Sequence, residues 1–272
     1  MTARTRSHPW PGALAQAFRL GLREVCWQRG ALVGIFLTYG VILSVWSSLF
    51  HLMPAARLAR VSLGYGEMVW YLALTEVVAF SIGHAYRRVQ DDIHDGEVTA
   101  FFARPVGYVA IVGAQELGQM TMKVGALLLP GALLAFALTG RVPVGPAVLV
   151  PLAVALAAGA ALLLGAQMLV GLATAWLGTS RPLFFIVQKL TFVLGGLVLP
   201  LDAYPPAVAG IAAWTPFPAM LYAPASIALD GSAAHIAAVL GLQAFWLAVI
   251  WLGVAGASFA FERRLVREDL AS

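Results

Sequence analysis

The feature that most constrains this chain is a series of long apolar runs. Crossing a hydrocarbon core of about 30 Å takes about 20 mostly apolar residues in a helix. The runs that approach or exceed this length are Ala31–Leu52, Ser62–His84, Gln119–Leu138, Ala147–Trp176, Leu183–Leu201 and Ala234–Phe261. They are continuously apolar and do not alternate between apolar and polar residues, which indicates membrane helices and excludes barrel strands.

The composition agrees with a chain whose solvent is the bilayer. Hydrophobic residues make up 61% of the 272 residues and charged residues only 11%, which is too apolar for a soluble domain. The sequence therefore predicts an all-α polytopic membrane protein with about six transmembrane helices, organised as one domain over residues 1–272. The bundle of spans is expected over residues 31–261, followed by a cytoplasmic tail at residues 262–272.

The distribution of arginines predicts the orientation of the spans, because cytoplasmic loops carry an excess of Lys and Arg over external loops. With the N-terminus in the cytoplasm, the external arginines are Arg57, Arg60 and Arg141. The cytoplasmic ones are then Arg4, Arg6, Arg19, Arg23, Arg29, Arg87, Arg88, Arg104, Arg181, Arg263, Arg264 and Arg267. Both termini are therefore expected in the cytoplasm. The protein itself is expected in the inner membrane of a bacterium. This asymmetry accounts for the net charge of +4 without a nucleic-acid partner.

Residues 1–30 are expected to form an interfacial helix on the cytoplasmic side. Apolar residues recur at helical spacing from Leu14 to Val25, and Arg19 and Arg23 fall on another face. Such a helix lies along the membrane lipid of the cytoplasmic leaflet, with its arginines at the headgroups. Two roles stay open, a simple membrane anchor and a mechanical link to a motor subunit.

The loop at residues 85–106, between the second and third runs, concentrates charge in an otherwise apolar chain. Its carboxylates from Asp91 to Asp95 are expected to begin a short helix near its positive dipole end. The adjacent Phe101 and Phe102 place apolar rings on a cytoplasmic surface. This combination favours docking to another protein, and packing of the rings back onto the membrane surface is the alternative.

The loop and the pattern of spans resemble the type-2 ABC-transporter permeases, in particular an uncharacterised six-span branch with an acidic, glycine-containing loop that ends in Arg-Pro. The residues that match this pattern are Ile93, Gly96, Glu97, Phe101, Arg104 and Pro105. In that family the loop carries the coupling helix that contacts the ATPase. The resemblance thus implies a coupling site made of Asp91, Asp92, Ile93, His94, Gly96, Glu97, Phe101, Phe102, Arg104 and Pro105.

The resemblance also implies the composition of the transporter. A pair of permease subunits, identical or different, joins a pair of ABC ATP-binding subunits and moves amphiphiles, drugs, lipids or glycans outward. The second and fifth spans then lie at the interface between the permeases, and the lack of a large external domain leaves the substrate open. The chain lacks a Gly-x-x-x-x-Gly-Lys-Ser/Thr phosphate loop, and its lysines are Lys123 and Lys189. ATP and Mg are therefore expected on the partner subunits and no cofactor on this chain, which predicts a permease without its own ATPase.

Prolines interrupt the apolar segment 202–231 between the fifth and sixth runs and exclude one continuous helix. A pair of short re-entrant helices in the outer leaflet fits this segment, as the resemblance also implies. The candidates for an external gate are Tyr204, Trp214, Phe217 and Tyr222. A structural cap over the helix bundle is the alternative.

Ionisable groups inside a membrane are costly and indicate function. Glu76 lies near the middle of the second run and is the strongest candidate for contact with the substrate, together with Trp70 and Phe80. If Glu76 lines the path, a cationic amphiphile is the expected cargo. Hydrogen bonding of its protonated side chain to a neighbouring helix is the alternative. Lys123 and Lys189 are expected to reach toward the cytoplasmic interface.

Other classes of protein compete with a transporter. An intramembrane enzyme would need a motif such as His-Glu-x-x-His or Gly-x-Ser-x-Gly, and neither occurs. The histidines are scattered and the one cysteine is Cys26, so no metal site is expected. A membrane anchor or assembly subunit that does not transport stays open as an alternative.

Overall fold

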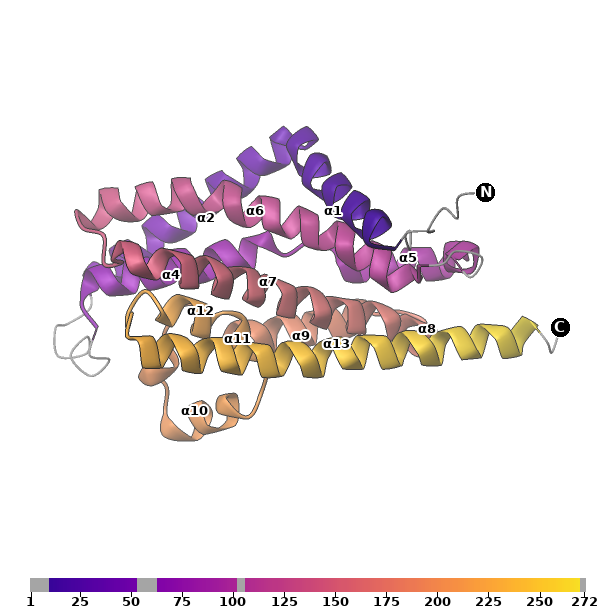
Figure 1. Ribbon diagram of the computed structural model, residues 1–272. Coiled ribbons are helices and arrows are strands. Elements are labelled where there is room, and N and C mark those ends of the chain that lie inside the picture. Colours follow the sequence, from indigo (N-terminus) through magenta and orange to yellow (C-terminus); the bar gives the residue numbers. More distant parts are fainter. Residues whose placement is uncertain (1–9, 53–62, 102–105, 270–272) are drawn as a thin grey trace, which may run out of the picture.

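The computed structural model describes residues 10–52, 63–101 and 106–269 and is drawn in Figure 1. These residues form helices and short 3-10 turns, and no strand occurs among them. The α-helices are α1 Trp10–Trp27, α2 Arg29–His51, α4 Tyr65–Ser81, α5 Ala85–His94, α6 Tyr108–Thr139, α7 Leu149–Leu172, α8 Thr174–Leu177, α9 Arg181–Leu194, α10 Pro206–Ala213, α11 Phe217–Met220, α12 Tyr222–Ser226 and α13 Ala233–Asp269. The 3-10 turns are η2 Glu97–Phe101, η3 Pro146–Val148 and η4 Leu201–Ala203. The prediction of an all-α polytopic membrane protein is confirmed.

Within the described residues, 5 helical stretches are long and apolar enough to cross a membrane. They are Gly30–His51, Tyr65–His94, Tyr108–Thr139, Pro146–Leu177 and Ala233–Arg264. These stretches form one elongated bundle (Figure 1). The expected third span is longer than predicted, because α6 begins at Tyr108 and not at Gln119. Ser62, the expected start of the second span, lies outside the described residues, and α4 begins at Tyr65.

The fifth expected span, Leu183–Leu201, is not one helix. Helix α9 has only 14 residues, so it is about 21 Å long. Gly196 follows with a φ of +70°, a left-handed conformation that favours glycine and ends the helix. Side chains of α4 hold the chain beyond this end, because the Tyr71 hydroxyl donates to the Gly196 carbonyl and Thr75 Oγ1 donates to the Leu197 carbonyl at 2.6 Å. The prediction of a continuous fifth span is therefore corrected to a short helix followed by an irregular stretch.

Helix α1 packs across the first half of α6 (Figure 1). A Cβ atom on Gly21 would collide with the Gln115 carbonyl oxygen, and one on Gly118 would collide with the Phe18 carbonyl oxygen. Glycine is needed at both positions because the two backbones approach so closely. The helix expected within residues 1–30 is thus α1, attached to a span along its length, and its position at a leaflet stays a prediction.

Short helices occupy the segment 202–231, but they are α10, α11 and α12 where only a pair was predicted. Helix α10 projects from the bundle, whereas α11 and α12 lie against α7 (Figure 1). The Gln243 side chain of α13 donates to the Ala155 carbonyl of α7 at 2.9 Å and to the Ala219 carbonyl of α11 at 3.0 Å. The segment is therefore joined to the bundle through α11 and α12.

The bundle has two distinct ends. The start of α1, helix α5, the turn between α8 and α9, and the end of α13 lie at one end, here named the α5 end (Figure 1). The start of α4, the end of α6 and the start of α13 lie at the other, here named the far end. The predicted coupling loop and the final turns of the chain's last helix therefore share one end of the molecule.

Candidate functional site

Helix α5 follows α4 after a short break at Ile82–His84. A Cβ atom on Gly83 would lie 3.0 Å from Glu116 Oε2, so glycine lets α6 approach the break. The helix that was expected to begin near Asp91 instead begins at Ala85, and its carboxylates lie in its last turns. This placement corrects the prediction that they occupy the positive end of the helix, because the chain resumes its helix directly after the Gly83 break.

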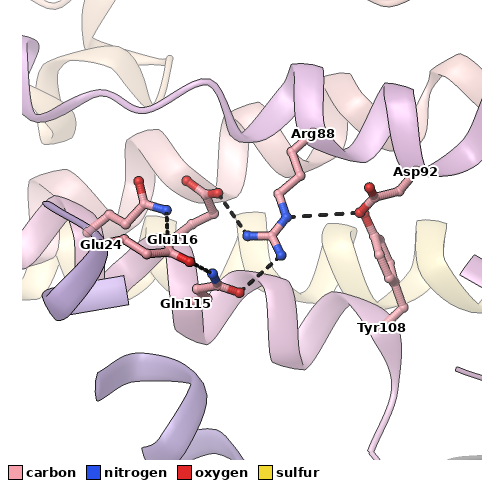
Figure 2. Close-up of polar contacts among 7 residues, drawn as sticks. Glu24, Arg88, Asp92, Tyr108, Gln115 and Glu116 are labelled. Carbon is pink, nitrogen blue, oxygen red and sulfur yellow. Dashed lines mark hydrogen bonds and ion pairs between the residues drawn. The ribbon is translucent and has the colours of Figure 1, made fainter. Parts of the chain in front are cut away.

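Asp92 lies near the negative end of α5, where a carboxylate is electrostatically unfavourable. Neighbouring groups offset this cost. The Tyr108 hydroxyl of α6 donates to Asp92 Oδ2 at 2.5 Å, and Arg88 Nε lies 4.0 Å from the same oxygen. The end of α5 is therefore attached to the start of α6 (Figure 2).

Arg88 is the centre of a polar network between α5, α6 and α1 (Figure 2). Its guanidinium donates to Glu116 Oε1 at 3.4 Å and to Gln115 Oε1 at 3.0 Å. The side-chain amides of Gln115 and Gln119 in turn donate to the Glu24 carboxylate of α1, at 2.5 and 2.8 Å. Glu116 is only 5% exposed, so this carboxylate depends on Arg88 for its charge partner.

A second set of hydrogen bonds attaches α5 to the turn before α9. Gln90 Oε1 accepts from the Ser180 backbone N–H at 2.8 Å and from the Ser180 hydroxyl at 2.9 Å. A ring nitrogen of His94 lies 2.9 Å from the Gly178 carbonyl oxygen. Helix α5 is thus bonded to α6 on one side and to the start of α9 on the other.

The structure places the predicted coupling residues on two sides of the α5–η2 segment, Ala85–Phe101. The exposed ones are Asp91, His94, Gly96 and Glu97, and the partly buried ones are Asp92, Ile93 and Phe101. The Phe101 ring packs edge-on against Tyr108, with centroids 5.3 Å apart, so it lies on α6 and not on a freely projecting surface. Phe102, Arg104 and Pro105 lie outside the described residues.

A cavity of about 750 Å³ lies between α2, α4, α6 and α9. Glu76 lines it and is 5% exposed, and no hydrogen-bond partner holds its carboxylate within the described part of the chain. Phe80 lines the same cavity about one turn further along α4 and packs edge-on against Tyr39, with centroids 6.1 Å apart. The structure therefore brings Glu76 and Phe80 to one site, here named the Glu76 cavity.

Trp70, the third residue predicted for the substrate path, lies elsewhere. Its indole N–H donates to the Arg141 carbonyl at 2.9 Å, near the far end of the bundle. It lines a separate, almost wholly apolar cavity of about 640 Å³ between α4, α6 and α7. The structure does not bring Trp70 to the Glu76 cavity, because the two side chains point to different faces of α4.

The family of the chain follows from its sequence match. Residues 58–262 match the family described as ABC-2 family transporter protein, which is about three quarters of the chain. The chain belongs to the ABC-2 transporter family. It is thus a multi-pass permease of an ABC transporter, a class of membrane subunit that works with ATP-binding subunits, and the resemblance seen in the sequence is confirmed. No curated protein matches the sequence.

The matched region of the permease contains α4, the α5–η2 segment, α6 to α12 and α13 as far as Glu262, whereas α1 and α2 precede it. The network around Arg88 therefore crosses the boundary of the match. Arg88, Gln115 and Glu116 lie inside it, and Glu24 lies before it. Helix α1 is a part of this permease that the match does not cover but that the charged network joins to it.

The four gate candidates of the permease, Tyr204, Trp214, Phe217 and Tyr222, separate in the structure. The Tyr204 hydroxyl donates to the Val193 carbonyl at 2.8 Å, and the Tyr222 hydroxyl donates to Asp202 Oδ2 at 2.9 Å. Phe217 is partly buried at the start of α11. Trp214 is 88% exposed and does not join them. The tyrosines therefore hold the chain that follows α9, and a gating role for them stays a prediction.

For several residues of the site, the sequence analysis predicted no function. Arg88 had been identified only as a cytoplasmic arginine, although its spacing of four residues from Asp92 is typical of an ion pair on one helix face. Gln115 and Glu24 are 91 residues apart, so no local pattern connects them. Lys123 lines the Glu76 cavity, and its expected reach toward the cytoplasmic interface stays a prediction.

Proposed function

We propose that this chain is the permease subunit of an ATP-driven exporter and that the α5–η2 segment docks onto a separate ATP-binding subunit. That partner would bind ATP and Mg, and the permease would form the translocation path as a homodimer or heterodimer. The substrate class is an amphiphile, drug or lipid-like molecule. The observation that carries the proposal is that α5 is bonded on both sides to membrane helices while part of its surface is exposed.

The hydrogen bonds of α5 would allow it to pass motion from the ATP-binding subunit to α6 and α9. A push on the exposed side, at His94 or Glu97, would move a helix that is bonded to α6 through Arg88 and to the start of α9 through Gln90. Charge-assisted hydrogen bonds of the Arg88 type are about twice as strong as neutral ones. The connection would therefore persist during each cycle of ATP hydrolysis, and closure of the ATP-binding subunits would shift the walls of the Glu76 cavity.

The arrangement of the bundle supports the predicted orientation. The α5 end also holds the start of α1 and the end of α13 (Figure 1), which agrees with cytoplasmic termini in a bacterial inner membrane. Helix α9 presents an apolar surface that includes Phe185, Ile186 and Val193, which are 48%, 58% and 55% exposed. Such a surface is suited to a second permease subunit, and the proposal assigns it to the dimer interface. The second span, expected at the same interface, is largely buried within this chain's own bundle.

The proposal is tested by purifying the tagged chain from membranes and identifying its partners. An ATP-binding subunit and a second permease are expected to co-purify, and the complex is expected to hydrolyse Mg-ATP faster when lipid-like compounds are added. In the same complex Glu97→Ala should reduce assembly or stimulation, whereas the exposed Arg23→Gln on α1 serves as the control. A chain that purifies without any ATP-binding subunit would favour the anchor or assembly alternative.

A further inference from the structure

The Glu76 cavity adjoins a second, polar cavity beside α5. This polar cavity has a volume of about 420 Å³. The two cavities share the side chains or backbone of Gly83, His84, Arg87 and Lys123 in their linings. The break between α4 and α5 is thus the boundary between the two cavities, and the mixed lining of the Glu76 cavity suits a molecule with one polar and one apolar part.

Glu76 and Lys123 belong to the neighbouring helices α4 and α6. The two helices run in opposite directions (Figure 1), with Trp70 bonded to Arg141 at the far end and Gly83 against Glu116 at the α5 end. Both side chains line the Glu76 cavity, so a carboxylate and an ammonium group face one space from neighbouring helices.

The charge of the Glu76 cavity is predominantly positive. Arg87, Lys123 and Arg181 line it, and Glu76 is the one carboxylate among its described lining residues. No ion pair or side-chain hydrogen bond holds these cationic groups within the described ranges, whereas the adjacent Arg88 is bound to several partners. Cationic groups without such a bond are available to a bound anion, and Lys123 in addition interacts electrostatically with Glu116 across the adjoining polar cavity.

The rest of the lining is apolar and aromatic. Phe80 of α4, Phe192 of α9 and Leu197 beyond α9 line the same cavity. Its volume of about 750 Å³ lies in the range of sites that bury most of a drug-sized ligand. Such surfaces suit an aliphatic chain, which keeps its van der Waals contacts when it moves from the lipid into the cavity.

We propose that the Glu76 cavity binds an amphiphile with an anionic head, of the phosphate or carboxylate class, and an aliphatic tail. The head lies against Arg87, Lys123 and Arg181, and the tail lies along Phe80 and Phe192. This inference rests on the proposed function, since it names the chemistry of the exported amphiphile. It replaces the cationic cargo that Glu76 alone suggested, because the cationic side chains that line the cavity outnumber that carboxylate.

The test uses the full chain in nanodiscs of phosphatidylcholine with photoreactive lipids that carry a diazirine in the tail. One probe is phosphatidic acid, and the matched probes are phosphatidylcholine and an alkyltrimethylammonium with the same tail. After irradiation, mass spectrometry measures the label on peptides that contain Phe80 or Phe192. We expect phosphatidic acid to label these peptides about fivefold more strongly than either matched probe, as charge-assisted binding predicts.

Substitutions test which basic side chains bind the anionic head group. Lys123→Gln and Arg181→Gln, alone and combined, are expected to lower labelling by phosphatidic acid toward the phosphatidylcholine level. Lys189→Gln is the control, because this exposed lysine on α9 is absent from the described lining. Glu76→Gln is expected to raise labelling by phosphatidic acid, since it removes a repelling charge, whereas a cationic cargo predicts a loss of ammonium labelling in the same variant.

Several outcomes would overturn the inference. They are equal labelling by all probes, preference for the ammonium probe, labelling that ignores both basic variants, and complete displacement of phosphatidic acid by inorganic phosphate alone. Circular dichroism and gel filtration of each variant identify failures of folding, and for a misfolded Lys123→Gln the Arg181→Gln variant carries the test. Because these measurements need no ATP-binding subunit, loss of coupling with intact labelling contradicts only the proposed function.

Discussion

The two ends of α4 are held by different chemistry. At the α5 end the helix continues into a network of charged groups, in which Arg88 donates to Glu116 and Gln115. Near the middle of the helix, neutral hydroxyls of Tyr71 and Thr75 donate to backbone carbonyls beyond α9, and at the far end the ion pair of Glu67 with Arg141 is partly exposed. Hydrogen bonds to charged groups contribute about 1.5–3 kcal/mol and neutral ones about 1 kcal/mol. The α5 end is therefore the harder one to separate, and the contacts with the end of α9 are the easier ones to open.

The largest effect is expected from breaking the charged network. Arg88→Ala leaves the buried Glu116 carboxylate without its charge partner, and it should lower the free energy of unfolding by about 2–3 kcal/mol, a value reduced because Arg88 is partly exposed. Thermal unfolding in detergent, followed by circular dichroism, measures the loss. Arg87→Ala is the matched control on the adjacent residue and should stay within about 0.5 kcal/mol of the wild type. Equal losses in both variants would contradict the central role of Arg88.

A smaller effect is expected where neutral groups hold the end of α9. Tyr71→Phe and Thr75→Val each leave one backbone carbonyl without its donor, which costs about 1–2 kcal/mol. Hydrogen exchange followed by mass spectrometry should show faster exchange in the peptide that contains Gly196. Tyr204→Phe, which removes a bond from a less buried hydroxyl, is the control with the smaller change. Unchanged exchange in all three variants would mean that α9 ends there without help from α4.

The bond between α5 and the start of α9 should affect coupling more than stability. Ser180→Ala removes the hydroxyl that donates to Gln90 but keeps the backbone N–H that donates to the same oxygen, so its cost is about 0.5–1 kcal/mol. If this bond transmits motion, the amount of substrate exported per ATP should fall while assembly stays intact. Thr121→Ala, which loses only a hydrogen bond within α6, supplies the comparison. Coupling that is lost equally in both variants would argue against transmission through Gln90.

The smallest effect is expected at the exposed pair near the far end. Glu67→Gln removes the charge that faces Arg141 at 3.4 Å, where the two side chains are 34% and 55% exposed. The amide keeps an oxygen that can accept from the Gly64 N–H, so the stability change should be below about 0.5 kcal/mol. Unfolding of the wild type at rising salt concentration provides an independent measure, since screening should remove the same small contribution. A loss near that of Arg88→Ala would erase the distinction between the two ends.

Much of the fold was predictable because the bilayer imposes a length on apolar runs. The spans that became α2, α7 and α13 could be read from the sequence within a few residues. The length of an apolar run does not predict the structure of Leu183–Leu201. Hydropathy contains no information that Gly196 ends the helix or that Tyr71 of another span donates a hydrogen bond to the Gly196 carbonyl. An apolar run of sufficient length predicts a span only where its backbone hydrogen bonds stay within the helix.

The candidate site was less predictable, because its contacts join residues far apart in the chain. The charge of the α5–η2 segment was visible in the sequence. How this segment packs against α6 and α1 depends on the Gly83 break and on Glu24 of α1. Glu76 lines one cavity and Trp70 on the same helix lines another, and contact of Glu76 with a substrate stays a prediction. Helical spacing alone does not predict which face of a span meets which neighbour.

Helix α13 has a consequence for the space available to a partner. With 37 residues it is about 55 Å long, whereas the hydrocarbon core is about 30 Å thick. Helix α13 starts at the far end of the bundle, and its charged last turns, which include Glu262 and Arg263, lie at the α5 end (Figure 1). There Arg264 Nη1 donates to the Ala175 carbonyl at 2.5 Å, which attaches the end of α13 to α8. If an ATP-binding subunit docks on α5 as proposed, the end of α13 bounds the surface available to it on that side.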